Sequence, residues 1–184
     1  LGWTIEETDR AFSTFIPQST PFDHNEDNLA KQPLRTALIY LAHLKALDEK
    51  VKIGKQSRLK LLTLWSDIAT TGENPLYAQL FLTRSVLKND QVFDNPLGEY
   101  LTAEWIEKLG AGQAKDSEFS LIRGHLPALQ GALGLTAGEI KQILKDAGQS
   151  LETAVLSLQN VSLLYRYRLL AQAVKLSVRE LIAL

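Results

Sequence analysis

One helix-start phrase occurs three times in this chain, and it limits the chain to a fold built from similar helices. Each copy places a hydroxyl side chain three residues before a glutamate: Thr4 and Glu7, Thr136 and Glu139, Ser177 and Glu180. This is the spacing of a capping box, in which the hydroxyl accepts a hydrogen bond from the third helical N–H group and the glutamate accepts one from the N–H of the cap residue. The three pairs therefore predict three helix starts, and they supply no chemistry.

Apolar residues flank the cap in the second and third copies. One precedes the cap and another occupies the fourth helical position, which is the pattern of a hydrophobic staple. We therefore expect Leu135 to contact Ile140, and Leu176 to contact Leu181.

The two ends of the sequence favour a piece of a longer polypeptide over a small processed protein. The third phrase stops at Leu184, about two turns into the helix that it opens, and an isolated helix of that length is marginal. The first residue is Leu1, and the sequence contains no methionine. We therefore expect the chain to be a fragment of a larger protein.

The composition is that of a soluble globular protein with a sizeable core. Hydrophobic residues make up 45% of the 184 residues and charged residues 22%, which is ordinary for such proteins. The 20 basic and 21 acidic residues leave a net charge of -1, which argues against nucleic acid as a partner. Without cysteine the chain has no disulfide, no thiolate metal ligand and no thiol nucleophile. The longest apolar run, residues 37–42, is too short to span a bilayer.

Apolar residues recur at helical spacing throughout, and no segment of useful length alternates as a strand would. Pro33 suits the first residue of a helix, and Pro127 should kink its helix or split it near Gly124. The sequence therefore predicts an all-α fold, an irregular multi-helix bundle in a single helical domain over residues 1–184, with a polar loop at 18–32. The helices are expected at residues 5–15, 33–47, 55–69, 76–87, 95–109, 119–133, 136–147, 151–158 and 160–174.

A regular spacing of helix starts suggests an alternative, α-solenoid-like architecture. Gly54, Asn95, Thr136 and Ser177 follow one another at intervals of 41 residues (95−54, 136−95, 177−136). Each interval holds about two helices, which is the size of a HEAT or armadillo helix-pair repeat. Gly54 and Asn95 lack the capping box, so a chance spacing is the simpler interpretation.

The three histidines do not form a metal-binding pattern. His24, His43 and His125 have no second ligand at metal spacing, and His43 lies beside an apolar stripe, where a solvated or hydrogen-bonded imidazole is the usual state. Arg123 and His125 could form a catalytic corner, but the sequence places no nucleophile or orienting carboxylate with them. The sequence therefore predicts no catalytic and no metal-ligating histidine.

Residues 23–34 partly match a calcium-binding loop. Asp23, Asn25 and Asp27 agree with the first three ligands of an EF-hand. The sixth position is Asn28 where glycine is required, and the twelfth is Leu34 where a bidentate glutamate is required. We therefore expect a solvated loop and no bound metal.

Residues 165–168 have the sequence Tyr-Arg-Tyr-Arg, in which aromatic and basic side chains alternate. The aromatic rings could hold cations, and the arginines could bind phosphate or carboxylate groups. A buried leucine-rich helix whose arginines reach solvent at its rim is the more ordinary interpretation. The three tryptophans lie in apolar stripes and are expected in the core: Trp3, Trp65 and Trp105. With no glycine-rich phosphate loop and no Gly-x-Ser-x-Gly elbow, we expect no enzyme activity, no cofactor and no catalytic residue.

Three longer stretches resemble a known family. They are residues 80–98 (LFLTRSVLKNDQVFDNPLG), 125–140 (HLPALQGALGLTAGEI) and 158–181 (LQNVSLLYRYRLLAQAVKLSVREL). They are similar to the helical part of the A components of tripartite (Tc) insecticidal toxin complexes, which are relatives of the Salmonella virulence plasmid A proteins. The similarity extends over most of the chain from about Leu34 onward, and the loop at 18–32 takes no part in it.

The resemblance implies a structural and non-catalytic role. It implies a secreted virulence protein that forms a homopentamer, with a helical shell around a pore-forming translocation channel. Its partners would be the rest of its own polypeptide, the B and C components of the toxin complex, and the host cell surface through other regions. This chain would be part of the shell, and no catalytic residue carries over. The main alternative is a free-standing helical protein-interaction module, with a peptide or phosphate groove formed by residues 165–168 and the neighbouring helix. A small helical enzyme is a third, weaker alternative.

Overall fold

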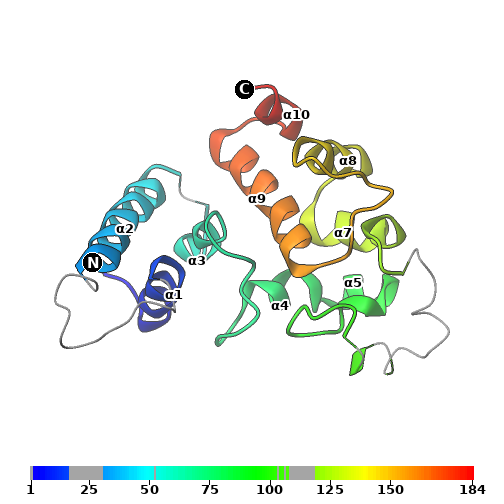
Figure 1. Ribbon diagram of the computed structural model, residues 1–184, viewed down its shortest axis with the longest axis horizontal. Coiled ribbons are helices and arrows are strands. Elements are labelled where there is room, and N and C mark those ends of the chain that lie inside the picture. The colour runs from blue at the N-terminus through cyan, green and yellow to red at the C-terminus, as the bar shows by residue number, and fades with distance from the viewer. Residues whose placement is uncertain (1, 17–30, 52, 103, 106, 108–118) are drawn as a thin grey trace. The chain divides into compact units, whose positions relative to one another are not determined.

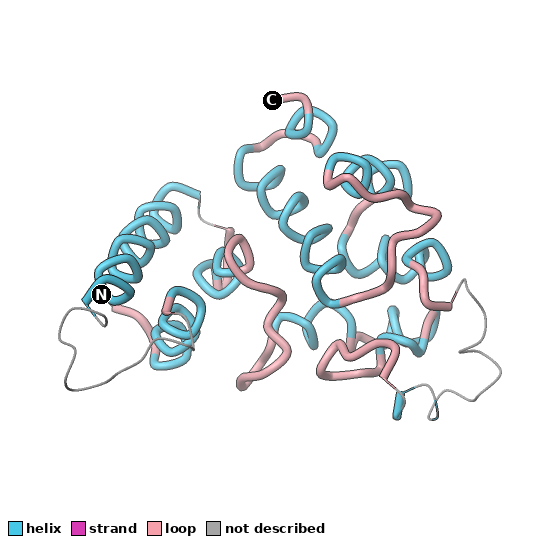
Figure 2. The backbone as a smooth tube through the Cα atoms, viewed as in Figure 1, coloured by secondary structure: helices cyan, strands magenta, loops and turns pink. Residues whose placement is uncertain are grey.

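The computed structural model describes residues 2–16, 31–51, 53–102, 104, 105, 107 and 119–184. Throughout these residues the secondary structure is helix, turn and loop, with no strand (Figure 2). Leu121 and Val155 form one isolated antiparallel bridge. The all-α fold class predicted from the sequence is therefore confirmed.

The chain forms two compact units, Leu1–Ser66 and Asp67–Leu184, where the sequence led us to expect one domain. Unit 1 consists of α1 (Ile5–Phe15), α2 (Lys31–Val51) and α3 (Ser57–Leu62), which pack against one another (Figure 1). Its core contains Ala11, Phe15, Ala37, Leu41, Leu44, Leu61 and Leu62.

The predicted polar loop at 18–32 lies outside the described residues except for its last two positions. These two, Lys31 and Gln32, begin α2, so the helix starts two residues before Pro33. A proline is tolerated there because the first N–H groups of a helix have no intrahelical partner.

The apolar stripe predicted along α2 is only partly buried. Ala37, Leu41 and Leu44 face the core, whereas Leu38 is 61% exposed and Leu34 is exposed as well. Among the described elements of this unit, α1 and α3 pack against α2 on the side that carries Ala37, Leu41 and Leu44. Apolar spacing therefore identified the helix but overestimated the width of its buried face.

The helix predicted over residues 55–69 is much shorter in the structure. α3 ends at Leu62, and the N–H groups of Leu64 and Trp65 bond to carbonyls three residues back, each at 3.0 Å. Trp65 is consequently 38% exposed, so its expected core position is wrong, and its ring packs edge-on against Phe15. Trp105 is buried as predicted, and Trp3 is half-buried.

Unit 2 contains the other helices whose bounds the structure describes, and residues 104, 105 and 107 are helical as well. In chain order the helices with described bounds are α4 (Leu76–Phe81), α5 (Arg84–Asn89), the 3-10 helices η1 (Gln91–Phe93) and η2 (Ile122–His125), α7 (Leu126–Leu133), α8 (Ala137–Asp146), α9 (Leu158–Val174) and α10 (Val178–Ile182). α9 packs against α7, α8 and α10, and α7 packs in turn against α4 and α5 (Figure 1). Fully buried side chains from these elements form its core, among them Ile122, Leu129, Leu133, Ile140, Leu144 and Leu164.

All three predicted capping boxes are present. The cap hydroxyls of Thr4, Thr136 and Ser177 accept from the third helical N–H at 3.1, 3.2 and 3.2 Å. The three glutamates accept from the cap N–H groups at 2.8, 2.7 and 2.8 Å. α1, α8 and α10 therefore begin where the local sequence places them.

The predicted helix boundaries agree with the structure at some positions and differ at others. The helix predicted over 119–133 is split just before Pro127, which is the second residue of α7, and Gly148, at φ +73°, follows the end of α8, both as expected. The helix predicted over 76–87 is two helices, because the Thr83 hydroxyl caps α5 by accepting from Val86 N–H.

Two further predictions need correction: the helix expected over 95–109 does not begin at Asn95, although residues 104, 105 and 107 are helical, and the helix expected at 151–158 is absent. Asn95 starts a turn, because its side-chain oxygen accepts from Leu97 N–H at 3.2 Å and its carbonyl accepts from Gly98 N–H at 3.0 Å. Residues 151–158 form turns and the bridge at Val155 before α9 starts at Leu158. Since no helix starts at Asn95, and α3 starts at Ser57 and not at Gly54, the 41-residue repeat fails at two of its four positions.

Candidate functional site

One buried polar group of unit 2 is His125, the last residue of η2, which directly precedes α7. Its side chain is buried, with 4% exposed. Its Nδ1 lies 2.5 Å from Oδ2 of Asp90, and its Nε2 lies 2.8 Å from the backbone carbonyl oxygen of Phe119. Both partners can act as acceptors, so the geometry favours the imidazolium form, in which both ring nitrogens carry a proton.

The environment of His125 favours this charged form. Burial lowers the pKa of His125, but the hydrogen bonds to Asp90 and to the Phe119 carbonyl, together with the charge of Asp90, raise it above its ordinary value of 6.5. The other carboxylate oxygen of Asp90 accepts from Val92 N–H at 3.1 Å and so caps η1. With both nitrogens occupied, the ring ties two segments together and has no lone pair for a substrate or a metal.

A buried pair of tyrosines lies in the same core. The hydroxyl oxygens of Tyr77 and Tyr100 are 2.5 Å apart, and Tyr77 donates to the carbonyl of Phe93 at 3.2 Å, so Tyr100 donates to Tyr77. Burial raises the pKa of Tyr77 and of Tyr100 far above the ordinary value of 10.0. Both phenols are therefore neutral and act as internal hydrogen-bond partners.

The catalytic corner considered at Arg123 and His125 needs a correction. The sequence offered no orienting carboxylate, but the structure supplies Asp90, from 35 residues earlier in the chain. Arg123 points elsewhere and pairs with Glu152 at 2.5 Å. Local sequence marks Asp90 only as a helix cap, so no signal could have connected it with His125.

The structure adds no ligand to the two metal sites considered from the sequence, the histidines and the EF-hand-like loop. His24 and residues 23–28 of the EF-hand comparison lie outside the described residues, and His43 is exposed on α2. Within the described ranges, no three or more His, Asp or Glu side chains are grouped so as to hold a metal ion.

The side chains of residues 165–168 are buried in unit 2 or have hydrogen-bond and ion-pair partners within it. Burial raises the pKa of Tyr165 to about 12. Arg166 pairs with Asp67 at 3.0 Å, and Arg168 donates to Gln172 at 3.0 Å. The Tyr167 hydroxyl donates to Asp146 Oδ2 at 2.5 Å, and this bond, together with burial, raises its pKa to about 12.

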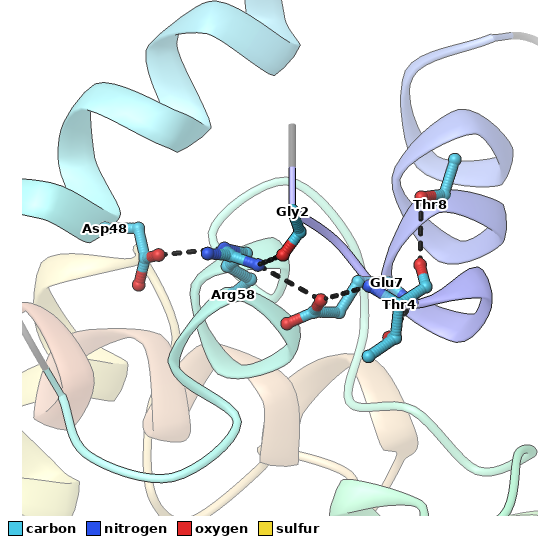
Figure 3. A network of polar contacts seen from close by, with 6 residues as sticks. All are labelled: Gly2, Thr4, Glu7, Thr8, Asp48 and Arg58. Atoms are coloured by element: carbon cyan, nitrogen blue, oxygen red, sulfur yellow. Dashed lines mark hydrogen bonds and ion pairs between the residues drawn. The ribbon is translucent and has the colours of Figure 1, made fainter.

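A second polar centre, which the sequence did not reveal, is Arg58 in unit 1 (Figure 3). Its Nε donates to Asp48 Oδ2 at 2.9 Å, while its Nη1 donates to Glu7 Oε2 at 3.1 Å and to the carbonyl of Gly2 at 3.2 Å. The guanidinium also lies 5.4 Å from the ring centre of Trp3. Since Glu7 closes the capping box of α1, Arg58 on α3 connects that box to Asp48 near the end of α2.

An open depression of about 410 Å³ lies on the surface of unit 2, between α8 and α10. Its lining residues are Gln142, Lys145, Asp146, Arg179 and Ile182. Sequence reasoning singled out none of these residues, because no local pattern shows which exposed helical positions face one another.

None of the described helices combines the length and the hydrophobicity needed to cross a lipid bilayer. Comparison of the chain with protein-family models, with curated proteins and with solved structures finds no match.

Proposed function

We propose that this chain is a structural, non-catalytic part of the helical shell of a secreted Tc-toxin A subunit. The observation that carries the proposal is how its buried and half-buried polar groups are used. His125 with Asp90 in unit 2, and Arg58 with Glu7 and Asp48 in unit 1, bind one another across helices. Such pairing stabilises a scaffold, whereas a catalytic acid or base must present a proton or lone pair to a substrate.

The location of the family-like stretches supports the same proposal. Residues 80–98 include α5 and η1, residues 125–140 include α7 and the start of α8, and residues 158–181 include α9 and most of α10. α5 packs against α7, α7 against α9, and α10 against both α8 and α9. The three stretches that resemble the family therefore lie on helices that pack against one another in unit 2.

Under this proposal the complete protein is a secreted homopentamer. It assembles with the B and C components, and other regions of the protein contact the host cell surface. The shell piece contributes packing surfaces and requires no cofactor or metal. The near balance of 20 basic and 21 acidic residues suits protein contacts better than nucleic acid.

A free-standing helical protein-interaction module is the second candidate, and one observation favours it. The depression between α8 and α10 is open and lined by two cations, Lys145 and Arg179. It is adjacent to Tyr167 through Asp146, but it is not the groove at residues 165–168 that the sequence suggested.

The two candidates are distinguished by the product of the complete reading frame that contains these residues. Its mass is measured by sedimentation velocity, and its particles are viewed by electron microscopy. We expect a large ring of five copies. A product little longer than 184 residues that sediments as a monomer would contradict the shell assignment and favour the interaction module. A stable pentamer of the 184-residue chain alone would place the ring contacts here and contradict an outer position in the shell.

A further inference from the structure

The depression between α8 and α10 has the dimensions and mixed chemistry of a binding site. Its volume of about 410 Å³ falls within the usual range for ligand pockets. Gln142, Lys145 and Asp146 lie on α8, and Arg179 and Ile182 lie on α10. Because α8 and α10 pack against each other, both walls belong to one unit and keep their spacing.

The two cations of the depression are available for a ligand. Neither Lys145 nor Arg179 has a hydrogen bond or ion pair with another side chain in the described part of the chain, and both are exposed. Arg179 presents a planar fork that suits a carboxylate, and Lys145 adds a second positive charge. Charge complementarity therefore calls for an anionic group.

The other lining residues narrow the choice of ligand. The Asp146 carboxylate accepts a hydrogen bond from Tyr167, which holds its negative charge at the edge of the depression. The charged lining residues therefore sum to only +1, which disfavours a multiply charged phosphate. Gln142 can both donate and accept, as a peptide group requires, and Ile182 offers an apolar contact.

We propose that this depression binds an acidic segment of a protein partner. The partner's glutamate or aspartate carboxylate pairs with Arg179 and Lys145, and a neighbouring apolar side chain covers Ile182. A small free ligand would have most of its surface enclosed, whereas four of the five lining residues here are exposed and the fifth is half-buried. Such an open site suits a side chain whose parent protein packs around the rim. The inference stands apart from the toxin assignment, since it uses only the lining residues on α8 and α10 and the bond from Tyr167 on α9.

Titration of the isotopically labelled 184-residue chain tests this proposal by nuclear magnetic resonance. The probe is the peptide acetyl-Ala-Leu-Glu-Ala-Ala-amide, and its matched control carries glutamine in place of glutamate. We expect the first peptide to shift the signals of Gln142, Lys145, Arg179 and Ile182, including the Ile182 methyl groups. Loss of a charge-assisted hydrogen bond in Arg179→Gln is expected to weaken binding by about fivefold or more.

The controls separate this site from general charge effects. Lys141→Gln removes an exposed cation of α8 that does not line the depression, and it should leave the affinity unchanged. Melting curves should be the same for both variants, because Arg179 and Lys141 are exposed. Equal binding of the glutamate and glutamine peptides, or no shift at millimolar peptide, would overturn the proposal. If sodium acetate shifts the same signals with the same affinity, the ligand is a free anion and the assignment to a peptide segment is wrong.

Discussion

Nδ1 of His125 and Oδ2 of Asp90 lie 2.5 Å apart, although the two residues are 35 positions apart in the chain. Asp90 follows α5 and caps η1, and His125 ends η2 and precedes α7. One charged hydrogen bond therefore joins two segments whose local sequences are independent. Because this bond raises the pKa of a buried histidine, the stability of unit 2 should respond to pH near neutrality.

The first prediction concerns this pH response. The folded-state pKa of His125 is raised above its ordinary value of 6.5, which is taken for the unfolded chain. Its contribution to stability is therefore complete below that value and is lost as the pH rises through the folded-state pKa. Urea unfolding at a series of pH values should show that the free energy of unfolding decreases as the pH is raised above 6.5. A free energy that rises over this interval would contradict the charged pair.

The second prediction tests the partner. Asp90→Asn keeps an oxygen to accept from Val92 N–H but removes the negative charge facing His125. The buried imidazole then loses a charged acceptor, and the free energy of unfolding should fall by about 1–3 kcal/mol. The variant should also lose most of the pH dependence near neutrality. If the variant is less stable but its free energy of unfolding depends on pH as in the wild-type chain, groups other than His125 and Asp90 cause that dependence.

The third prediction concerns Arg58. Arg58→Lys keeps the positive charge, but an ammonium cannot reproduce the planar set of bonds to Asp48, Glu7 and the Gly2 carbonyl. Unit 1 should lose about 1–2 kcal/mol of stability, measured by amide hydrogen exchange in α1 and α3. Lys45→Gln is the matched control, because it breaks only a surface pair with Glu49 and should cost less than about 0.5 kcal/mol. Equal effects of the two substitutions would show that the Arg58 network adds little.

The fourth prediction concerns the end of α9. Lys175 adopts a left-handed conformation with φ +58°, and Leu176 N–H bonds to the Ala171 carbonyl at 2.9 Å, as in a Schellman motif. Glycine has no Cβ and takes this conformation without strain, so Lys175→Gly should raise the free energy of unfolding by about 0.5–1 kcal/mol. Gly148→Ala, at φ +73° after α8, is the converse change and should destabilise the protein by a similar amount. Thermal unfolding of both variants gives the comparison, and shifts of the same sign would refute the argument.

The fifth prediction concerns the second capping box. Thr136→Ala removes the hydroxyl that accepts from Glu139 N–H, and it should cost about 1 kcal/mol in denaturant unfolding. Thr136→Ser keeps the hydroxyl and should remain close to the wild-type chain. A neutral alanine variant would mean that this cap adds nothing to stability.

Local sequence determined the helical class and several helix starts, because both depend on contacts within a few residues. A capping box needs only a cap residue and the third residue of its helix, so Thr4, Thr136 and Ser177 could be recognised directly. The break before Pro127 follows in the same way from the shape of proline. The resemblance to the toxin shell also came from the sequence, and it stays a prediction.

The tertiary structure decided which apolar surfaces are covered and which polar groups meet. Leu38 and Trp65 fit apolar stripes, yet they are exposed, because burial depends on where neighbouring helices lie. Asn95 was expected to start a helix, but its side chain and carbonyl hold a turn instead. The pairing of His125 with Asp90, the bonds of Arg58 and the depression between α8 and α10 all join residues distant in sequence. Helix spacing places such residues on a face, and only the packing of one helix against another brings those faces together.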